Sequence, residues 1–357
     1  MKKILKKIIF GILVIFLLFA GYLFIGKPPQ AKEITWGVNF SQKHTENLGL
    51  NWQETYLALL DDLKVKNIKL ITHWDLIEPE KDKYFFEDLD WQIKEAENHS
   101  AKILLVIGMK TPRWPECHIP EWAKGLVEED RSSSPPSLSR RESSVTKEEQ
   151  QERILNLVKE IILRYRGRAS IWAWQVENEP FFPFGECPWV DKNFLKKEID
   201  LVKSLDPRPV VISDSGEGSL WIEAAKLGDI VGTTMYKKVW FSQIGVYIYY
   251  PLPPSFYWRK AKYIEKIFDK KVIVVELQAE PWGPKLLYES PLEEQEKTMN
   301  LERFKANIEF AKKTGLDEFY LWGGEWWYWL KEKQNKPEIW QEAKKLFNRT
   351  DIYVSEG

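Results

Sequence analysis

The sequence has few residues of the kinds that metal and cofactor sites require. Among 357 residues there are 2 cysteines and 4 histidines, and the histidines show no HExxH or other recognised metal-ligand spacing. No GxGxxG or GxxxxGK(S/T) motif follows a strand-like segment, and no GxSxG motif is present. We therefore expect no metal and no cofactor, and the usual signals of phosphate-binding loops and serine hydrolases are missing.

An excess of charge of one sign is also lacking. The chain has 52 Lys and Arg against 53 Asp and Glu. Five of the basic residues lie in residues 1–30, where no acidic residue occurs, so the rest of the chain carries 47 basic and 53 acidic residues. Because phosphate contacts need a basic surface, we do not expect a nucleic-acid partner.

The remaining composition is that of a folded globular protein. Apolar residues make up 44% and charged residues 29% of the chain. Glycine and proline number 19 and 20, which together fall far below the roughly 25–30% that marks low-complexity sequence. Aromatic residues reach 14%, with 18 tryptophans, and such flat rings suit a groove that stacks against sugars, bases or other planar apolar faces.

An uncharged run near the N-terminus predicts a membrane anchor. The 19 residues between Lys7 and Lys27 would form a helix of about 28 Å, which is enough to cross a bilayer. Four lysines precede the run and only Lys27 closely follows it, which favours a cytoplasmic N-terminus. We therefore expect residues 1–30 to form a cytoplasmic stub and a single-pass transmembrane signal anchor, with residues 31–357 extracytoplasmic. A cleaved signal peptide, which would make the protein secreted, is the alternative, although no clear small-x-small cleavage site is present.

Strand-like and helix-like patterns alternate after the anchor. Eight short apolar segments read as strands, at Ile34–Phe40, Asn67–Thr72, Ala101–Gly108, Ser170–Val176, Pro209–Ser213, Ile230–Met235, Lys271–Glu276 and Glu318–Trp322. Helical patterns separate them, at Trp52–Lys64, Glu87–Asn98, Lys147–Tyr165, Asn193–Ser204, Tyr257–Phe268 and Leu292–Thr314. A helix between the fifth and sixth strands is less clear from the pattern.

Eight strand–helix units predict an α/β fold, the (β/α)8 barrel, with the active site on the loops after the strands. The alternative is a doubly wound open sheet. The polar segment 128–144 has almost no apolar residues, so we expect it to be a mobile part of the third loop rather than a domain boundary. Residues 31–357 would then be one catalytic domain.

Carboxylates follow two of the predicted strands. The fourth strand reads IWAWQVENEP and ends at Asn178 and Glu179, and the seventh reads VIVVELQAEPW and carries Glu276 after four apolar residues. In a closed barrel these two strand ends face each other across the mouth. Cleavage of a glycosidic bond needs such a pair of carboxyl groups.

These motifs resemble glycoside hydrolase clan A, particularly its β-galactosidase and cellulase-like branches. The resemblance lies in WQVENEP, TTMY, VVELQ and FYLWGGEWW, in that order, and in HWDLIEPEKDKYFFEDLD as the second βα unit. It covers roughly residues 34–347. It implies a retaining glycoside hydrolase acting on a carbohydrate substrate.

Carried onto this chain, the clan pattern gives roles to five residues. It implies that Glu179 is the general acid/base and Glu276 the nucleophile. Asn178 would bind the sugar 2-hydroxyl, Tyr236 would contact the nucleophile, and Trp322 would form the floor of the central subsite.

The sequence departs from the clan pattern on the second strand. Members commonly have an arginine there, near the nucleophile, where this chain reads IKLITHW. Lys69 could supply the positive charge but not the planar two-pronged contact of an arginine.

Other residues near the strand ends are weaker candidates for the site. Glu177 and Glu280 are the rivals of the two chosen acids, and they could instead be substrate contacts or surface charges. His73 could line the pocket or be a structural histidine. The tryptophans of the strand-end loops could be sugar platforms, although large aromatic residues more often pack; they are Trp114, Trp282, Trp326 and Trp327.

Cys117 and Cys187 follow the third and fourth strands and are expected to form a disulfide. Both lie beyond strand ends on the same face, and export would place them in an oxidising environment. Two free thiols are the alternative.

We therefore expect a membrane-anchored retaining glycosidase that acts by double displacement on an extracytoplasmic oligo- or polysaccharide. A transglycosidase of the same fold and a non-catalytic carbohydrate-binding barrel are the alternatives.

Overall fold

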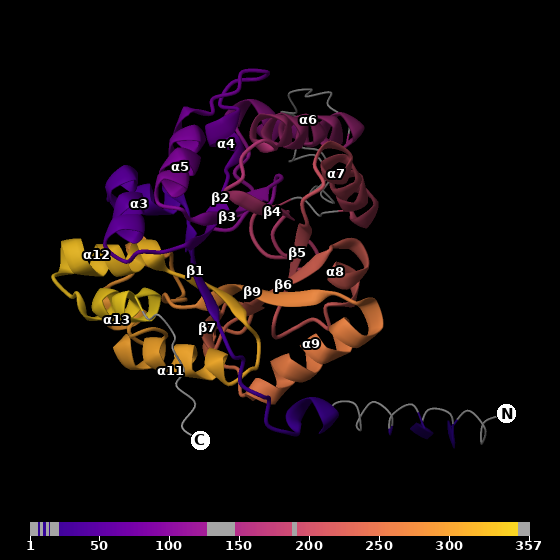
Figure 1. Ribbon diagram of the computed structural model, residues 1–357, viewed down its shortest axis with the longest axis vertical. Coiled ribbons are helices and arrows are strands. Elements are labelled where there is room, and N and C mark those ends of the chain that lie inside the picture. The colour runs from indigo at the N-terminus through magenta and orange to yellow at the C-terminus, as the bar shows by residue number, and fades with distance from the viewer. Residues whose placement is uncertain are drawn as a thin grey trace, which may run out of the picture.

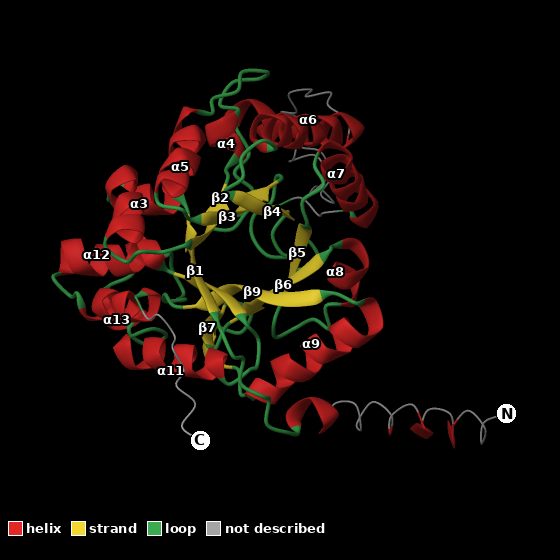
Figure 2. Ribbon diagram, viewed as in Figure 1, coloured by secondary structure: helices red, strands yellow, loops and turns green. Residues whose placement is uncertain are grey.

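The computed structural model describes residues 6–7, 10–11, 14, 21–126, 147–187 and 191–348 of the chain. Eight parallel strands close into a barrel in the order β1, β2, β3, β4, β5, β6, β9 and β10, with helices on the outside (Figures 1 and 2). The predicted (β/α)8 barrel is confirmed, and the open doubly wound sheet is wrong.

Every predicted barrel strand is present, with bounds that differ from the prediction by two residues at most. The barrel strands are β1 (Thr35–Phe40), β2 (Asn67–Ile71), β3 (Lys102–Ile107), β4 (Ile171–Val176), β5 (Val210–Asp214), β6 (Ile230–Met235), β9 (Lys271–Gln278) and β10 (Glu318–Trp322). Most of their residues are buried, since the barrel interior covers one face of each strand and the helices cover the other.

Five of the six predicted helices are present as single helices on the outside of the barrel. The longer helices are α3 (Trp52–Asp61), α5 (Glu87–Asn98), α6 (Lys147–Tyr165), α7 (Lys192–Leu205), α9 (Pro254–Phe268), α11 (Leu301–Lys312), α12 (Gly324–Gln334) and α13 (Glu338–Phe347). The shorter ones are α2 (Gln42–Asn47), α4 (Trp74–Ile77), α8 (Ile222–Leu227) and α10 (Leu292–Gln295), with 3-10 helices η1 (Glu121–Leu126) and η3 (Leu287–Glu289).

The single helix predicted over Leu292–Thr314 is wrong, because the structure divides this segment into α10 and α11. Asn300 has an extended backbone, and its side-chain oxygen accepts a hydrogen bond from the Arg303 N–H at 3.0 Å. This N-cap begins a new helix and prevents α10 from continuing through it.

A β-hairpin that the sequence reading did not identify lies between β6 and α9. Strands β7 (Lys238–Phe241) and β8 (Val246–Tyr249) pair in antiparallel fashion. The backbone N–H of Trp240 donates to the Trp282 carbonyl at 3.0 Å, so the hairpin contacts the loop after β9. The pattern KVWF-SQIG-VYIY, with glycine in the short connection, is a hairpin signal.

One extra residue in β9 places Glu276 inside the barrel. Ile273 and Val275 belong to an interior apolar cluster, so strict alternation would turn Glu276 outward. However, the register pairs Val274 with Thr233 and Glu276 with Thr234, which leaves Val275 as an insertion. The alternation is therefore reset, and Glu276 faces the barrel mouth above the apolar cluster.

The predicted N-terminal anchor lies largely outside the described residues. Among the residues that the structure does describe, none forms a helix with the length and apolar character needed to span a bilayer. Residues 21–24 form a helical turn that lies near α9 in Figure 1. Leu23 is buried, and Phe24 packs against Phe256 of α9 at 5.8 Å. The predicted mobile segment 128–144 also lies outside the described residues.

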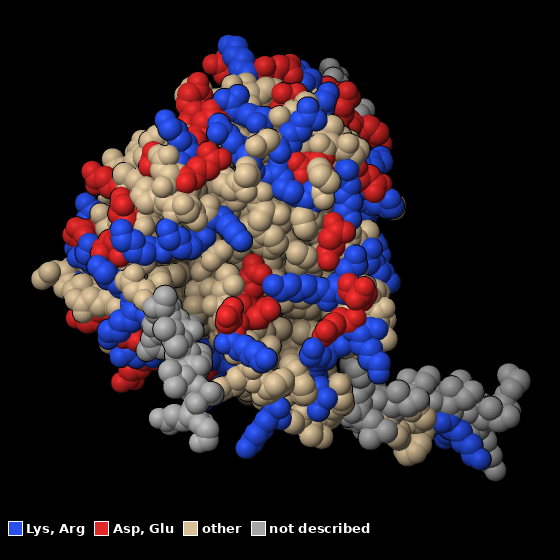
Figure 3. Space-filling view, in the orientation of Figure 1, with Lys and Arg blue, Asp and Glu red and all other residues tan. Residues whose placement is uncertain are grey.

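Positive and negative side chains are interspersed over the face drawn in Figure 3. The exposed ion pairs of the described residues include Lys196 with Asp200 at 2.6 Å. Among the described residues visible there, neither sign gathers into one continuous patch.

Candidate active site

The two predicted catalytic carboxyl groups come from opposite parts of the barrel wall and meet at its mouth. Glu276 lies in β9, and Glu179 follows β4. Both side chains are buried, with exposed fractions of 3% for Glu276 and 8% for Glu179. The charge of Glu276 is close enough to raise the pKa of Glu179.

Both oxygens of Glu276 are held by neighbouring side chains. Lys69 Nζ, from β2, lies 2.9 Å from Oε1, and the Tyr236 hydroxyl donates a hydrogen bond to Oε2 at 2.9 Å. Burial, followed by the charges of Glu276 and Glu179, raises the pKa of Tyr236 well above its ordinary value, so Tyr236 remains a donor. Burial lowers the pKa of Lys69, although the ion pair with Glu276 opposes this effect.

Glu179 is in surroundings that keep its carboxyl group protonated. Its Oε1 accepts a hydrogen bond from Thr234 Oγ1 at 3.3 Å, and its backbone N–H donates to Ser213 Oγ at 2.8 Å. Burial, and then the charges of Glu276 and Glu116, raise the pKa of Glu179 well above its ordinary value. A protonated carboxyl group facing an ion-paired carboxylate can supply a proton at neutral pH.

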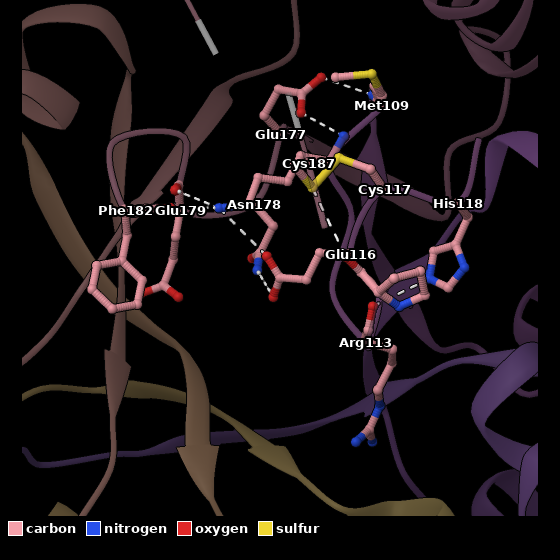
Figure 4. The surroundings of a disulfide bond; sticks show 12 residues. Met109, Arg113, Glu116, Cys117, His118, Glu177, Asn178, Glu179, Phe182 and Cys187 are labelled. Atoms are coloured by element: carbon pink, nitrogen blue, oxygen red, sulfur yellow. Dashed lines mark hydrogen bonds and ion pairs between the residues drawn. A yellow bond between two sulfur atoms is a disulfide. The ribbon is translucent and has the colours of Figure 1, made fainter. Parts of the chain in front are cut away.

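The backbone after β4 turns Glu177 and Glu179 in different directions. Both residues have positive φ values, 59° and 40°, which are uncommon for residues with side chains and occur often at active sites. The carboxylate of Glu177 accepts hydrogen bonds from the backbone N–H groups of Met109 and Lys110, at 2.8 and 2.6 Å (Figure 4). Glu177 therefore fixes the β3 loop, and of the two acids Glu179 is the one beside Glu276.

Glycine is required at position 108, where the Glu177 carboxylate approaches the backbone. Gly108 has a φ of 116°, and a Cβ atom there would lie 2.3 Å from Glu177 Oε1. Any larger residue would push this carboxylate off the N–H groups that it binds.

Asn178 lies between the acid and the β3 loop. Its Nδ2 donates to Glu116 Oε1 at 3.4 Å, and its Oδ1 accepts from Gln175 Nε2 at 3.3 Å. Asn178 is 1% exposed, so these contacts fix the orientation of its amide in the barrel mouth.

An arginine from the β3 loop organises the other side of the mouth. The Arg113 guanidinium lies 3.8 Å from the ring centroid of Trp322, the predicted floor of the central subsite. It pairs with Glu280 and, at 2.9 Å, with Glu325. Burial alone would raise the pKa of Glu280, but Arg113 and His44 outweigh it and lower the pKa to about 2. Glu280 is thus an ionised partner of Arg113.

We expect Arg113→Met to lower the free energy of unfolding by about 3–5 kcal/mol, because it leaves two buried carboxylates without their cation. Arg113→Lys, the matched control, keeps the charge but loses the two-pronged contact, so its loss should be smaller. Urea unfolding followed by tryptophan fluorescence measures both variants. Equal stability of Arg113→Met and the unsubstituted chain would contradict the structural role of this ion-pair network.

The four tryptophans of the strand-end loops divide into two groups. Trp282 is half-buried and its ring packs against Tyr236 at 5.3 Å, whereas Trp114 is 41% exposed and packs against Phe184 at 6.0 Å. Trp326 and Trp327 are 2% and 0% exposed within the core. Trp282 and Trp114 are therefore the two that have surface near the mouth.

His73 lies in a small buried cluster of polar side chains. Its Nε2 is 3.2 Å from Ser41 Oγ, and its ring packs edge-on against His118 at 4.5 Å. Burial, and then the charges of His118 and Lys43, lower the pKa of His73 well below its ordinary value, so it is neutral. Within the described part of the chain, no group of three or more His, Cys, Asp or Glu side chains could hold a metal ion.

The predicted disulfide between Cys117 and Cys187 is confirmed. The two Cα atoms are 5.2 Å apart, and the bond joins the loop after β3 to the loop after β4 (Figure 4). Lys110 adds a second connection, because its Nζ donates to the backbone carbonyls of Glu179 and Phe182 at 3.0 and 2.8 Å. The two loops beside the acid therefore form one cross-linked unit.

Three buried charged residues of the mouth were not identified from the sequence. Arg113 and Glu116 lie in TPRWPEC after β3, and Glu325 lies in WGGEWW after β10. Their positions directly after barrel strands were the available signal. Glu280, a partner of Arg113, is 167 positions away in the sequence, and no local pattern shows such a pairing.

Known proteins are similar to this chain both in a sequence family and in fold. A glycoside hydrolase family model described as beta-galactosidase matches residues 46–196. The structure is similar to xylanase 10B from Thermotoga maritima, with 16% identity, a TM-score of 0.55, and coverage of 88% of this chain and 96% of that chain. Xylanase 10B from Thermotoga petrophila RKU-1 gives 16% identity, a TM-score of 0.53, and coverage of 88% and 95%.

A beta-galactosidase from the haloarchaeon Halorubrum lacusprofundi is similar as well, with 17% identity and a TM-score of 0.54 over 81% of this chain and 52% of that chain. No curated protein matches the sequence. At these identities the solved structures establish the fold. With the family match, they confirm the predicted resemblance to glycoside hydrolase clan A.

Proposed function

We propose that this barrel of the clan A type is a retaining glycoside hydrolase that cleaves O-glycosidic bonds by double displacement. The observation that carries the proposal is the set of contacts and charges around the two carboxyl groups. Glu276 is paired with Lys69 and Tyr236, and Glu179 has a raised pKa in the same mouth. An ionised nucleophile and a protonated acid are what the first step requires.

In the first step an oxygen of Glu276 attacks the anomeric carbon of the sugar. The bond to the leaving oxygen breaks, and that oxygen takes the proton of Glu179. The product is a glycosyl ester of Glu276. Lys69 and Tyr236 hold the carboxylate in place before the attack.

In the second step Glu179, now ionised, takes a proton from water, and the water oxygen attacks the anomeric carbon. The ester bond breaks and Glu276 leaves as a carboxylate, so the sugar keeps its original configuration. A sugar hydroxyl in place of water would give transglycosylation by the same route.

The substrate class that we propose is an extracytoplasmic oligo- or polysaccharide. The disulfide supports this location, because disulfides persist mainly in oxidising compartments. The uncharged run before Lys27 and its flanking lysines support a membrane-anchored chain with an exported barrel.

A panel of aryl glycosides and polysaccharides, incubated with the full chain in detergent, tests the activity. Product anomers are followed by NMR at early times, before mutarotation. Retention of configuration is expected. Inversion would contradict double displacement, and sugar binding without turnover across the panel would favour a non-catalytic binding barrel.

The anchor is tested separately. We expect the full chain to remain with membranes after an alkaline carbonate wash and a chain without residues 1–20 to be released in folded form, since Leu23 and its contacts are kept. N-terminal sequencing of the mature protein is the second measurement. A mature chain that begins near Tyr22 would show a cleaved signal and a secreted enzyme.

A further inference from the structure

Glu116 brings a third carboxyl group into the mouth of the barrel. It is 6% exposed and comes from the loop after β3. Its Oε1 accepts the hydrogen bond of Asn178 Nδ2, while its Oε2 lies 3.4 Å from Lys110 Nζ and has no hydrogen-bond partner among the described residues (Figure 4). The ion pair with Lys110 leaves lone pairs of this oxygen that can accept a hydrogen bond from a ligand.

Asn178 complements this acceptor with a donor. Its Oδ1 accepts hydrogen bonds from Gln175 Nε2 at 3.3 Å and Ser213 Oγ at 3.5 Å. One N–H of its amide is directed to Glu116, so the second N–H is the group left for a ligand. Glu116 and Asn178 together therefore present one acceptor and one donor side by side.

This pair lies beside both reacting groups. Burial raises the pKa of Glu116 to about 7; Lys110 opposes this shift, and the charge of Glu276 adds to it. The charge of Glu116 in turn raises the pKa of Glu179. The clan pattern assigns the hydroxyl on carbon 2 of the attacked sugar to Asn178, and Glu116 is hydrogen-bonded to Asn178.

The protein fixes Glu116 from several sides. The next residue, Cys117, forms the disulfide, and Glu116 itself has a φ of 69°. Gly185 of the opposite loop approaches so closely that a Cβ atom there would lie 2.9 Å from Glu116 Cβ and 2.7 Å from the Pro115 carbonyl oxygen. Such a fixed carboxyl group suits recognition of a ligand group better than a role in surface charge.

We propose that Glu116 is a specificity-determining residue that accepts a hydrogen bond from the 2-hydroxyl of the sugar attacked by Glu276, the hydroxyl that the clan pattern already assigns to Asn178. The inference rests on the proposed function, since it places a sugar between Glu179 and Glu276. It assigns to the disulfide the role of holding a substrate contact.

The test compares the full chain with Glu116→Gln on two ligands, the aryl glycoside that the panel shows to be the best substrate and its 2-deoxy analogue. The ratio of the two kcat/KM values gives the contribution of the 2-hydroxyl. We expect this ratio to fall by about 10- to 100-fold in Glu116→Gln, as for loss of a hydrogen bond to a charged group. An unchanged ratio would overturn the inference.

Two further variants serve as controls. Glu186→Gln removes an exposed carboxylate next to Cys187 on the same cross-linked unit and should leave the ratio unchanged. Glu116→Asp keeps the charge on a shorter side chain and should give an intermediate ratio. If both Glu116 variants fail to fold, Glu116 is a structural residue and the inference is wrong.

A binding measurement separates this inference from the proposed function. Calorimetry with the methyl glycoside and methyl 2-deoxyglycoside of the same sugar needs no turnover. If the unsubstituted chain binds sugars without cleaving them, the proposed function fails, yet the same loss of discrimination in Glu116→Gln would still support the inference. If no sugar binds at all, both fail.

Discussion

Glu276→Ala should abolish turnover, with a loss on the order of 10⁴-fold or more in kcat, as expected when a group that forms the covalent intermediate is removed. The variant keeps Lys69 and Tyr236, which then face a small cavity in place of a carboxylate. Steady-state rates with an activated aryl glycoside measure the loss.

Azide provides the control for this variant. A small anion can enter the space left by the carboxylate and attack the anomeric carbon directly, so we expect partial recovery of the rate and a glycosyl azide of inverted configuration. NMR of the product identifies the anomer. If azide restores activity to Glu179→Ala with an inverted product, and not to Glu276→Ala, the two roles are exchanged.

The strands could be predicted because parallel strands in a barrel are buried on both faces. Segments such as KVIVVE are then continuously apolar, and the first polar residue after the run marks the mouth. Glu276 was found in this way and Tyr236 through the clan resemblance, and the structure joins them by a hydrogen bond. The order of the strands followed from the rule that consecutive βα units are neighbours.

The orientation of Glu276 could not be predicted from the alternation of residues. The insertion of Val275 changes which side chains face inward, and it depends on pairing with β6, not on the local sequence. The contacts between loops could not be predicted from the sequence either. Arg113 reaches Glu280 and Glu325 through the folded chain, so a single sequence gives only the presence of the charges and not their pairing.

Lys69 shows how a departure from the expected motif can be resolved by geometry. The sequence has lysine where clan members commonly have arginine. In the structure its Nζ lies 2.9 Å from Glu276 Oε1, so a positive charge next to the nucleophile is retained without the planar contact. Arg113, which comes from the next strand's loop, serves a different pair of carboxylates.

Glu179→Ala should lower kcat/KM strongly for substrates with poor leaving groups and little for substrates with good ones. Loss of a general acid costs about 10²- to 10⁴-fold where the leaving oxygen needs a proton. A 2,4-dinitrophenyl group leaves without protonation, so formation of the glycosyl ester on Glu276 should be little affected. Values of kcat/KM for a series of aryl glycosides, from dinitrophenyl to unsubstituted phenyl, measure this dependence. A uniform loss across the series would contradict the assignment of Glu179 as the acid.

The pH dependence gives the same assignment by a second route. Burial and the charges of Glu276 and Glu116 raise the pKa of Glu179, so the unsubstituted chain should lose kcat/KM for poor leaving groups as pH rises through that pKa. Glu179→Ala should lack this alkaline loss.

The raised pKa of Glu179 also affects the stability of the fold. A buried acid with a raised pKa contributes stability below its unfolded pKa, and this contribution is lost as pH rises through the folded pKa. Unfolding of Glu179→Ala should therefore depend less on alkaline pH, and an unchanged dependence in both measurements would show that another group titrates.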